Sequence, residues 1–99
     1  MTEKLTLETA IAHRAFGVAG KPGETVDVFI GKPFKLQEEE WACPYRIVGA
    51  GEDICFQIYG IDSVQALQLV WKVIDANIVA AGLELMLYGE KFTGFVAED

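Results

Sequence analysis

The sequence predicts an α+β domain: an antiparallel meander of about four β-strands, formed by two hairpins, with one long C-terminal helix packed on one face. Two patterns carry this prediction. In two stretches before Tyr59, apolar residues occupy every second position, as in a half-buried strand. From Asp62 onward, apolar residues recur with the period of an α-helix. With 99 residues, the chain is expected to form a single domain over residues 1–99.

The second strand of the first predicted hairpin covers residues 25–30. Apolar residues alternate there, and those expected to face the core are Val26, Val28 and Ile30. Pro33 follows the strand and ends it, because proline has no N–H to donate to a neighbouring strand. The preceding residues 19–23 are rich in glycine and proline and are expected to form the loop of the hairpin.

The sequence does not fix the register of the first strand of this hairpin, over residues 10–18. Apolar residues fall at odd positions from Leu5 to Ile11, whereas Phe16 and Val18 fall at even positions. Because side chains alternate between the two faces of a sheet, both sets face the core only if the register shifts. A β-bulge near residues 12–15 would produce that shift.

The second hairpin has the best-defined register. The apolar residues that alternate before its glycine-rich turn are Trp41, Cys43, Tyr45 and Ile47, and those after it are Ile54, Phe56 and Ile58. With Ala50 and Gly51 at the tip, the facing pairs are Ile47 with Ile54, Tyr45 with Phe56, and Cys43 with Ile58. All three pairs are apolar and share one face, so a slip of one residue would break the match.

A helix is predicted to begin after Asp62, a favourable N-cap, with Gln65 placed three residues later as in a capping box. The arc expected to face the sheet contains Val64, Leu67, Val70, Trp71, Ile74 and Ile78. A second flank carries smaller apolar residues, namely Ala66, Leu69, Val73, Ala76 and Ala80. A helix of a two-layer domain does not need this second flank, so we interpret it as a candidate interface with another chain.

Two interpretations of the segment after Gly82 stay open. In the one that we favour, the helix continues to Tyr88 in the same phase and Gly89 ends it. In the other, the helix stops at Gly82 and residues 83–87 form a strand with alternating leucines. The apolar residues of the C-terminal tail are expected to pack against the domain; they are Phe92, Phe95 and Val96.

Composition and charge exclude several classes of protein. Apolar residues make up 52% of the chain, too many for a disordered tail, and two cysteines are too few for a disulfide-stapled miniprotein. The net charge is −7 and the eight basic residues are scattered, so we expect no nucleic-acid partner. Without a long uncharged run or a signal-peptide pattern at the N-terminus, we expect a cytoplasmic protein with no membrane partner.

One face of the second hairpin carries the candidate functional residues. In the predicted register, Cys43 points to the core and Cys55 to the opposite face, so the two cannot form an intramolecular disulfide. Cys55 lies opposite Arg46, a cation that would lower the pKa of the thiol and raise its reactivity. The candidate functional face comprises Arg46, Cys55, Gln57 and Tyr59. Such a mixture of aromatic and polar groups suits a protein contact and equally an ordinary solvated sheet surface.

Neither a metal nor another cofactor is expected. His13 is the only histidine, and we expect it to be a surface or hydrogen-bonded residue and not a catalytic one. One histidine and two divergent cysteines do not supply the three or four ligands of a zinc site. The acidic run at residues 38–40 directs its carboxylates differently and is expected to be a solvated loop.

Three short motifs lie between Val26 and Leu69. They are VDVFIGKP at residues 26–33, WACPYRI at residues 41–47 and GIDSVQAL at residues 60–67. They resemble the strand-then-proline segment, the W-x-C-P-[YF]-R-I strand and the G-x-D-[AS]-x-Q-A-L helix start of an uncharacterised bacterial domain of unknown function. That family has no assigned activity, so the resemblance implies a fold and no mechanism. Arg46 and Gln65 are the motif positions with no evident structural role beyond capping.

These observations predict a non-catalytic, acidic protein-interaction module of unknown specific role. It would act as a homodimer or through a protein partner, in a regulatory or immunity-like role, since an acidic surface attracts a basic partner. The alternative is a small ligand-binding protein or a thiol-dependent enzyme that uses Cys55 and Arg46. A third hypothesis is a structural domain retained inside a larger complex.

Overall fold

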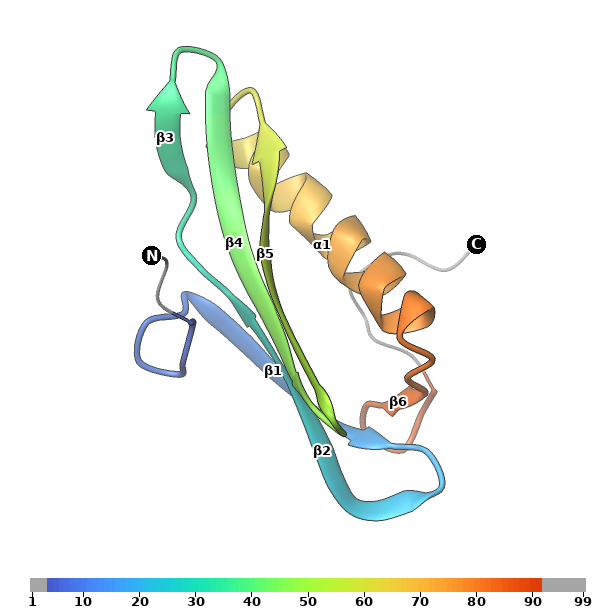
Figure 1. The fold of residues 1–99 in the computed structure, drawn as a ribbon. Helices are drawn as coiled ribbons and strands as arrows, with labels where there is room; N and C mark the ends of the chain where they lie inside the picture. Colours follow the sequence, from blue (N-terminus) through green and yellow to red (C-terminus); the bar gives the residue numbers. More distant parts are fainter. Residues whose placement is uncertain (1–3, 92–99) are drawn as a thin grey trace.

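One antiparallel sheet of six strands is covered on part of one face by a single helix in the computed structural model, which describes residues 4–91 (Figure 1). The elements are β1 (Ala12–Val18), β2 (Lys21–Ile30), β3 (Phe34–Gln37), β4 (Glu40–Gly49), β5 (Glu52–Gly60), α1 (Ser63–Ala80) and β6 (Leu85–Met86). β4 lies at the centre, with β5 on one side and β2 and β3 in succession on the other. β1 pairs with β2, and β6 pairs with the end of β1.

The predicted fold class is confirmed, but the predicted strand number is wrong. The four long strands follow the order of a meander, as expected for two hairpins. The prediction missed the two short strands, β3 and β6. β3 falls in the segment interpreted as a connection between the hairpins, where Phe34 pairs with Ala42 and Lys35 with Trp41.

The register of the β4–β5 hairpin is confirmed. Ile47 pairs with Ile54, Tyr45 with Phe56, and Cys43 with Ile58. The loop is the expected two-residue tip, in which Ala50 and Gly51 both have positive φ, at 51° and 85°. A two-residue loop with two positive φ angles matches the twist of a hairpin, so the turn and the apolar pairs specify the same register.

The core lies between this sheet and α1. Its buried sheet residues alternate along β2 and β4, and they are Val26, Val28, Ile30, Cys43, Tyr45 and Ile47. The helix contributes Ala66, Val70, Ile74 and Ile78, and the β1–β6 end is closed by Phe16, Leu85 and Leu87. Trp41 and Trp71, both predicted to anchor the core, are half-buried and pack against it.

The start of α1 is capped as predicted, but its sheet-facing arc is rotated from the predicted one. Asp62 accepts a hydrogen bond of 2.8 Å from the Gln65 N–H, and the Gln65 side chain accepts one from the Ile61 N–H. Ala66, which we assigned to the second flank, is fully buried, whereas Val64 is 60% exposed. The cause is close packing at Gly60, where a Cβ would lie 2.6 Å from the Ala66 nitrogen.

The favoured extension of the helix to Tyr88 is wrong. α1 ends at Ala80, and Gly82 adopts a positive φ of 71° that an α-helix cannot continue through. The alternative interpretation is confirmed in part, since Leu85 and Met86 form β6 against Val18 and Gly17. The predicted apolar tail of Phe92, Phe95 and Val96 lies outside the described residues. Within residues 4–91, no helix has the length and hydrophobicity needed to cross a membrane.

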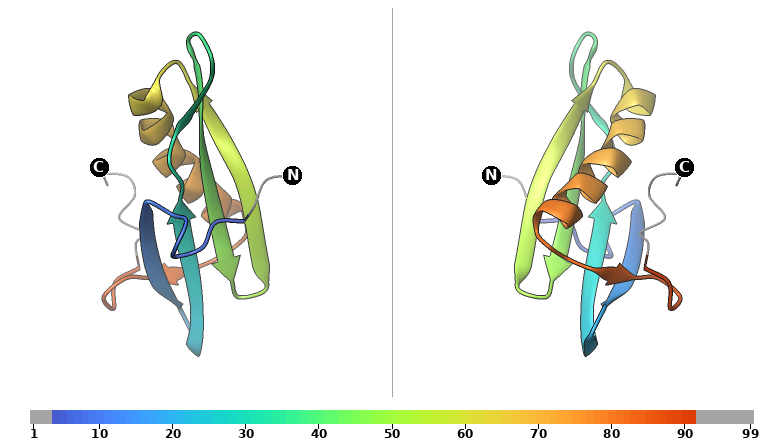
Figure 2. Two further views of the ribbon diagram at one scale, coloured as in Figure 1. Left: turned by 90° about the vertical axis from the view of Figure 1, so that its left-hand side faces the viewer. Right: turned by 90° about the vertical axis from the view of Figure 1, so that its right-hand side faces the viewer.

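The predicted bulge near residues 12–15 is also wrong. β1 pairs regularly with β2 from Ala12 to Gly17, and the register shifts only between Gly17 and Val18. The apolar residues before Ala12 do not belong to a strand. They lie in a segment that crosses the face of the sheet opposite to α1 (Figure 2), so their odd spacing never has to match that of β1.

Candidate functional site

The predicted functional residues lie on the face of the sheet that α1 does not cover. Arg46 on β4 is paired with Phe29 on β2 and with Cys55 on β5, so these three side chains form one row across the sheet. Gln57 and Tyr59 follow Cys55 at alternate positions of β5 and therefore point to the same face. The sequence thus placed all four candidate residues on one face of the sheet, and the register agrees.

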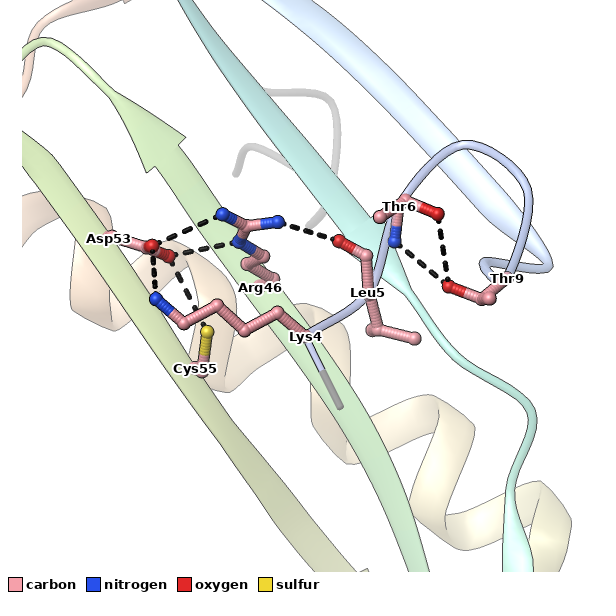
Figure 3. Close-up of polar contacts among 7 residues, drawn as sticks. All are labelled: Lys4, Leu5, Thr6, Thr9, Arg46, Asp53 and Cys55. Carbon is pink, nitrogen blue, oxygen red and sulfur yellow. Dashed lines mark hydrogen bonds and ion pairs between the residues drawn. The ribbon is translucent and has the colours of Figure 1, made fainter. Parts of the chain in front are cut away.

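An ion-pair network centred on Asp53 holds this face together (Figure 3). Arg46 binds the Asp53 carboxylate through two nitrogens, with Nε–Oδ1 at 2.9 Å and Nη2–Oδ2 at 3.1 Å. Lys4 Nζ lies 2.7 Å from Oδ2 of the same carboxylate. Sequence analysis missed Asp53, although a signal was present: it is two residues from Cys55 and so diagonal to Arg46 on the same face.

The N-terminal strap, residues 4–9, lies across this face. The third nitrogen of Arg46, Nη1, donates to the Leu5 carbonyl at 2.9 Å. The Leu5 side chain packs so closely over Gly31 that a Cβ there would lie 3.0 Å from a Leu5 methyl group. A turn closed by Thr6 and Thr9 then returns the chain to β1. The strap is therefore anchored by charge at its start and by packing at Leu5.

Asp53 and Arg46 stabilise each other's charged forms. The pKa of Asp53 is held well below its usual range, first by the hydrogen bonds from Arg46 and then by that from Lys4. The pKa of Arg46 is raised, chiefly by its hydrogen bond to Asp53. The guanidinium therefore has its strongest partner in this carboxylate, which leaves the thiol of Cys55 with little of its influence.

The expected activation of Cys55 by Arg46 is not what the geometry supports. The pKa of Cys55 is raised, first by desolvation and then by the hydrogen bond that its thiol donates to Asp53, with Sγ–Oδ1 at 3.4 Å. The lowering by Arg46 is smaller than these effects. Cys43 is buried, and burial raises its pKa to about 11. Both thiols are therefore predominantly protonated at neutral pH.

His13 lies on the same face but far from Cys55. Its Nε2 is 2.7 Å from Asp27 Oδ1, and its ring stacks on Phe29 with the centroids 4.8 Å apart. The row from His13 to Cys55 crosses four strands, a separation of about 14 Å at the usual strand spacing. A thiol–imidazole pair would need contact within hydrogen-bond distance, so these two residues do not form one.

A pocket of about 280 Å³ lies beside the network, close to the lower limit for small-molecule sites. Its lining comes from the start of the strap and from β4 and β5, and it includes Lys4, Leu5, Pro44, Cys55, Gln57 and Tyr59. Gln57 donates to the Tyr59 hydroxyl at 3.0 Å. Three of the four predicted residues therefore meet at one pocket, whereas Arg46 contributes to the neighbouring ion pairs.

The predicted interface on α1 divides into buried and exposed parts. Ala66 belongs to the core, Leu69 and Val73 are half-buried, and Ala76 and Ala80 are exposed. Val73 packs directly against the core. The acidic run contains the β3–β4 turn, where Glu38 pairs with Lys35 at 2.9 Å. Among the described residues, no three histidine, cysteine or acidic side chains are grouped as metal ligands.

The outer edge of β5 is a second candidate surface, which sequence analysis did not single out. β5 pairs with β4 along its length, and within residues 4–91 no strand lies on its other side (Figure 2). Phe56 is 66% exposed and Tyr59 48% exposed on this strand. From Ile54 to Tyr59 the strand contains neither a charged residue nor proline.

Comparison with known proteins identifies a family but no activity. The chain belongs to the family described as Domain of unknown function (DUF6968), whose model matches residues 12–90. The matched range spans the residues of the three motifs between Val26 and Leu69, and the predicted resemblance of the chain to a domain of unknown function is confirmed. No curated protein and no solved structure significantly matches the chain.

Proposed function

We propose that this member of the DUF6968 family is a non-catalytic protein-interaction module that acts as a homodimer in the cytoplasm. The observation that carries the proposal is the uncovered edge of β5. In this nine-residue strand every second residue directs its backbone N–H and C=O groups away from β4, and the strand also exposes the large apolar side chain of Phe56. Such an edge is a template for pairing with another strand.

Proteins normally protect an edge strand with charged residues, proline, a bulge or a covering segment. β5 has acidic residues at its first two positions, Glu52 and Asp53, and neither a charged residue nor proline in the rest of the strand. Its pairing with β4 runs without a register shift from Glu52 to Gly60, so no bulge turns the edge away. A strand left open in this way favours a binding role.

The face of the sheet that α1 does not cover supports a non-catalytic role. Asp53 is bound by Arg46 and Lys4, and Gln57 is bound to Tyr59. Cys55 has a raised pKa and lies far from His13. These side chains stabilise one another, whereas a catalytic site needs a group poised for proton transfer or nucleophilic attack.

The charge of the chain bears on further partners. A homodimer would carry twice the net charge of −7 and would present a strongly acidic surface. Such a surface accelerates association with a basic protein and slows it with an acidic one. This favours a regulatory or immunity-like role in which the dimer captures a basic partner.

The decisive experiment is size-exclusion chromatography with light scattering over a dilution series from micromolar to nanomolar concentration. We expect a mass twice the 10.9 kDa of the chain at the upper end, and dissociation on dilution. A mass of one chain at every concentration would overturn the homodimer. A binding role would then have to rest on a different protein.

The pocket supports a second candidate function, the binding of a small ligand. Its polar groups are the Gln57 amide, the Tyr59 hydroxyl and the Lys4 ammonium, which suit a neutral or anionic polar molecule. A thermal-shift screen of such compounds tests this function when wild type and Gln57→Ala are compared. A compound that stabilises only the wild type supports it, and a panel with no such compound argues against it.

A further inference from the structure

We infer that two copies of this chain join through the outer edges of β5, antiparallel, with the twofold axis at Phe56. The inference rests on the homodimer proposed above and specifies its surface. It predicts one continuous sheet through both copies. It follows from three properties of β5: the direction of its free backbone groups, its distribution of charge and the position of its exposed aromatic side chain.

The direction of the backbone groups follows from Pro44. Its carbonyl accepts a hydrogen bond of 2.9 Å from the Gly31 N–H and therefore points toward β2. Since Pro44 pairs with Gln57 on β5, that pair is a non-hydrogen-bonded one. In such a pair the N–H and C=O groups of Gln57 point to the outer edge. By the alternation of antiparallel pairing, the same holds for Asp53, Cys55 and Tyr59.

The longest pairing of this edge with its own copy is centred on Phe56, the middle residue of the nine-residue strand. The hydrogen-bonded pairs are then Cys55 with Gln57 and Asp53 with Tyr59, each formed twice. Between them, Phe56 faces Phe56 of the second copy, and Ile54 faces Ile58. Every outward N–H and C=O group of the strand obtains a partner in this register.

The charge distribution favours the antiparallel orientation. The acidic residues of β5, Glu52 and Asp53, stand at its start, and its end is uncharged. Antiparallel pairing places them beside Gly60 and Tyr59 of the second copy, so no like charges face each other. A parallel arrangement would set Asp53 against Asp53, which destabilises strand pairing. In a chain of net charge −7, an edge uncharged from Ile54 to Gly60 is the place where two copies approach with least repulsion.

The side chains fit the same arrangement. A twofold axis perpendicular to the sheet keeps each face on its own side, so both helices lie on one face of the joined sheet. Phe56 is on that face, and pairing covers a side chain that is 66% exposed in the single chain. On the other face, the Tyr59 hydroxyl accepts from Gln57 and keeps its own hydrogen. It is free to donate that hydrogen to Asp53 of the second copy.

Cross-linking tests the register. In Q57C the new thiol lies opposite Cys55 of the second copy, at a Cα separation of about 5.5 Å for a hydrogen-bonded pair, which suits a disulfide. Oxidation of Q57C with copper–phenanthroline should give a covalent dimer on a non-reducing gel. Wild type and the double variant C55S/Q57C should stay predominantly uncrosslinked. Cys43 is present in all three proteins but is buried, so it should not contribute to cross-linking in any of them.

A second variant tests the surface itself. F56E places two like charges at the axis, and we expect the dissociation constant to rise by more than about tenfold. The matched control is V79E on α1, where the wild-type side chain is 74% exposed and lies away from β5 in sequence and on the exposed side of the helix. Circular dichroism and thermal unfolding should show that both variants keep the fold.

The outcomes separate the two proposals. A wild type that is monomeric at every concentration overturns the homodimer and this inference together. A wild-type dimer that F56E does not weaken and that Q57C does not cross-link overturns only the β5 edge. Efficient cross-linking of wild type, or of C55S/Q57C, would move the axis to Cys55 or to Gln57 and would overturn the register proposed here. Cross-linking of Q57C alone, with a weakened F56E dimer, supports it.

Discussion

The two faces of the sheet are built on different physical principles. The face under α1 is mainly apolar: Val26, Ile47 and Ile74 are completely buried, and the buried Tyr45 hydroxyl there accepts a hydrogen bond from Asn77. The face under the N-terminal strap is polar, and its charged groups are joined to one another while still partly exposed. The first face supplies most of the stability through burial, and the second holds the strap in place by directional contacts.

This difference supports the proposal that the polar face has no catalytic role. Hydrogen bonds and ion pairs there satisfy the groups that chemistry would require, and they do so within one chain. The contacts join residues far apart in the sequence: Arg46 donates to the carbonyl of Leu5, 41 positions away, and Asp53 pairs with Lys4, 49 positions away. The contacts of Arg46 and Asp53 with Lys4 and Leu5 therefore hold the strap against the β4–β5 hairpin. Substitutions on the two faces should differ in size and in their dependence on pH.

The largest effect is expected on the apolar face. Ile74→Ala removes a fully buried side chain from the centre of α1 and leaves a cavity against the sheet. We expect the free energy of unfolding to fall by about 2–5 kcal/mol, measured by chemical denaturation.

The matched control is Val79→Ala, which shortens a side chain that is 74% exposed on the same helix. It should change the free energy of unfolding by less than about 0.5 kcal/mol. Equal losses in the two variants would contradict the assignment of the core to the row that contains Ile74.

A smaller effect is expected where the strap packs on the polar face. Gly31→Ala introduces a Cβ that would lie 2.6 Å from the Pro44 side chain and 3.0 Å from Leu5. We expect a loss of about 1–3 kcal/mol in the free energy of unfolding, because the Pro44 ring and the strap both have to shift. Faster hydrogen exchange at the Ala10 amide, which donates to Thr6, would report that movement.

Gly17→Ala provides the comparison on β1. A Cβ there would lie 4.0 Å from Met86, which is ordinary contact. This variant should leave both the free energy of unfolding and the exchange of the strap nearly unchanged. If Gly17→Ala and Gly31→Ala behave alike, close packing of Leu5 does not hold the strap.

Sequence reasoning was most successful where two local signals agreed. In the β4–β5 hairpin, the apolar alternation and the Ala50–Gly51 tip specify the same register, and the structure has it. On α1, the sequence placed the cap correctly but not the sheet-facing arc. The apolar residues of this helix nearly surround it, so their periodicity could not choose between Val64 and Ala66. Gly60, a residue outside the helix, makes that choice by allowing close approach.

The strap shows a different limit. Residues 5–11 alternate like a strand, but the chain forms a turn there, in which the Ala10 N–H donates to the Thr6 carbonyl, and it reaches β2 only at Ile11, whose N–H donates to the Ile30 carbonyl. Their position is decided by Arg46 and Asp53, which are distant in sequence. The Arg46–Cys55 pair was predictable from the hairpin register, whereas the preference of Arg46 for Asp53 follows from the stronger attraction between opposite charges.

The ion pairs of Asp53 should make the free energy of unfolding decrease at acid pH. The pKa of Asp53 is lowered in the folded state, so its contribution is complete above the unfolded value near 3.8 and is lost as the pH falls further. Asp53→Asn should reduce the free energy of unfolding by about 1 kcal/mol at neutral pH. The difference between variant and wild type should narrow below about pH 4.

Glu38→Gln tests whether any ion pair on the surface has the same effect. The ion pair between Glu38 and Lys35 is 2.9 Å long, as is the contact of Arg46 Nε with Asp53, but the Glu38 side chain is 90% exposed. We expect a change of less than about 0.5 kcal/mol in the free energy of unfolding at neutral pH. A difference between wild type and Asp53→Asn that stays constant down to the lowest pH would show that the charge of Asp53 does not stabilise the fold.

The smallest expected effect concerns the rates at which the two thiols are alkylated. Cys43 is buried and Cys55 is exposed, so alkylation by iodoacetamide, followed by mass spectrometry, should modify Cys55 alone in the folded protein. Cys55 should react more slowly than a free small-molecule thiol at neutral pH, because its pKa is raised. Asp53→Asn removes the acceptor of the thiol and a nearby negative charge, and should speed the reaction a few-fold. Arg46→Met should slow it, because Arg46 lowers the Cys55 pKa. A wild-type Cys55 that reacts faster than the free thiol would reverse this order and restore the hypothesis of thiol chemistry on the polar face.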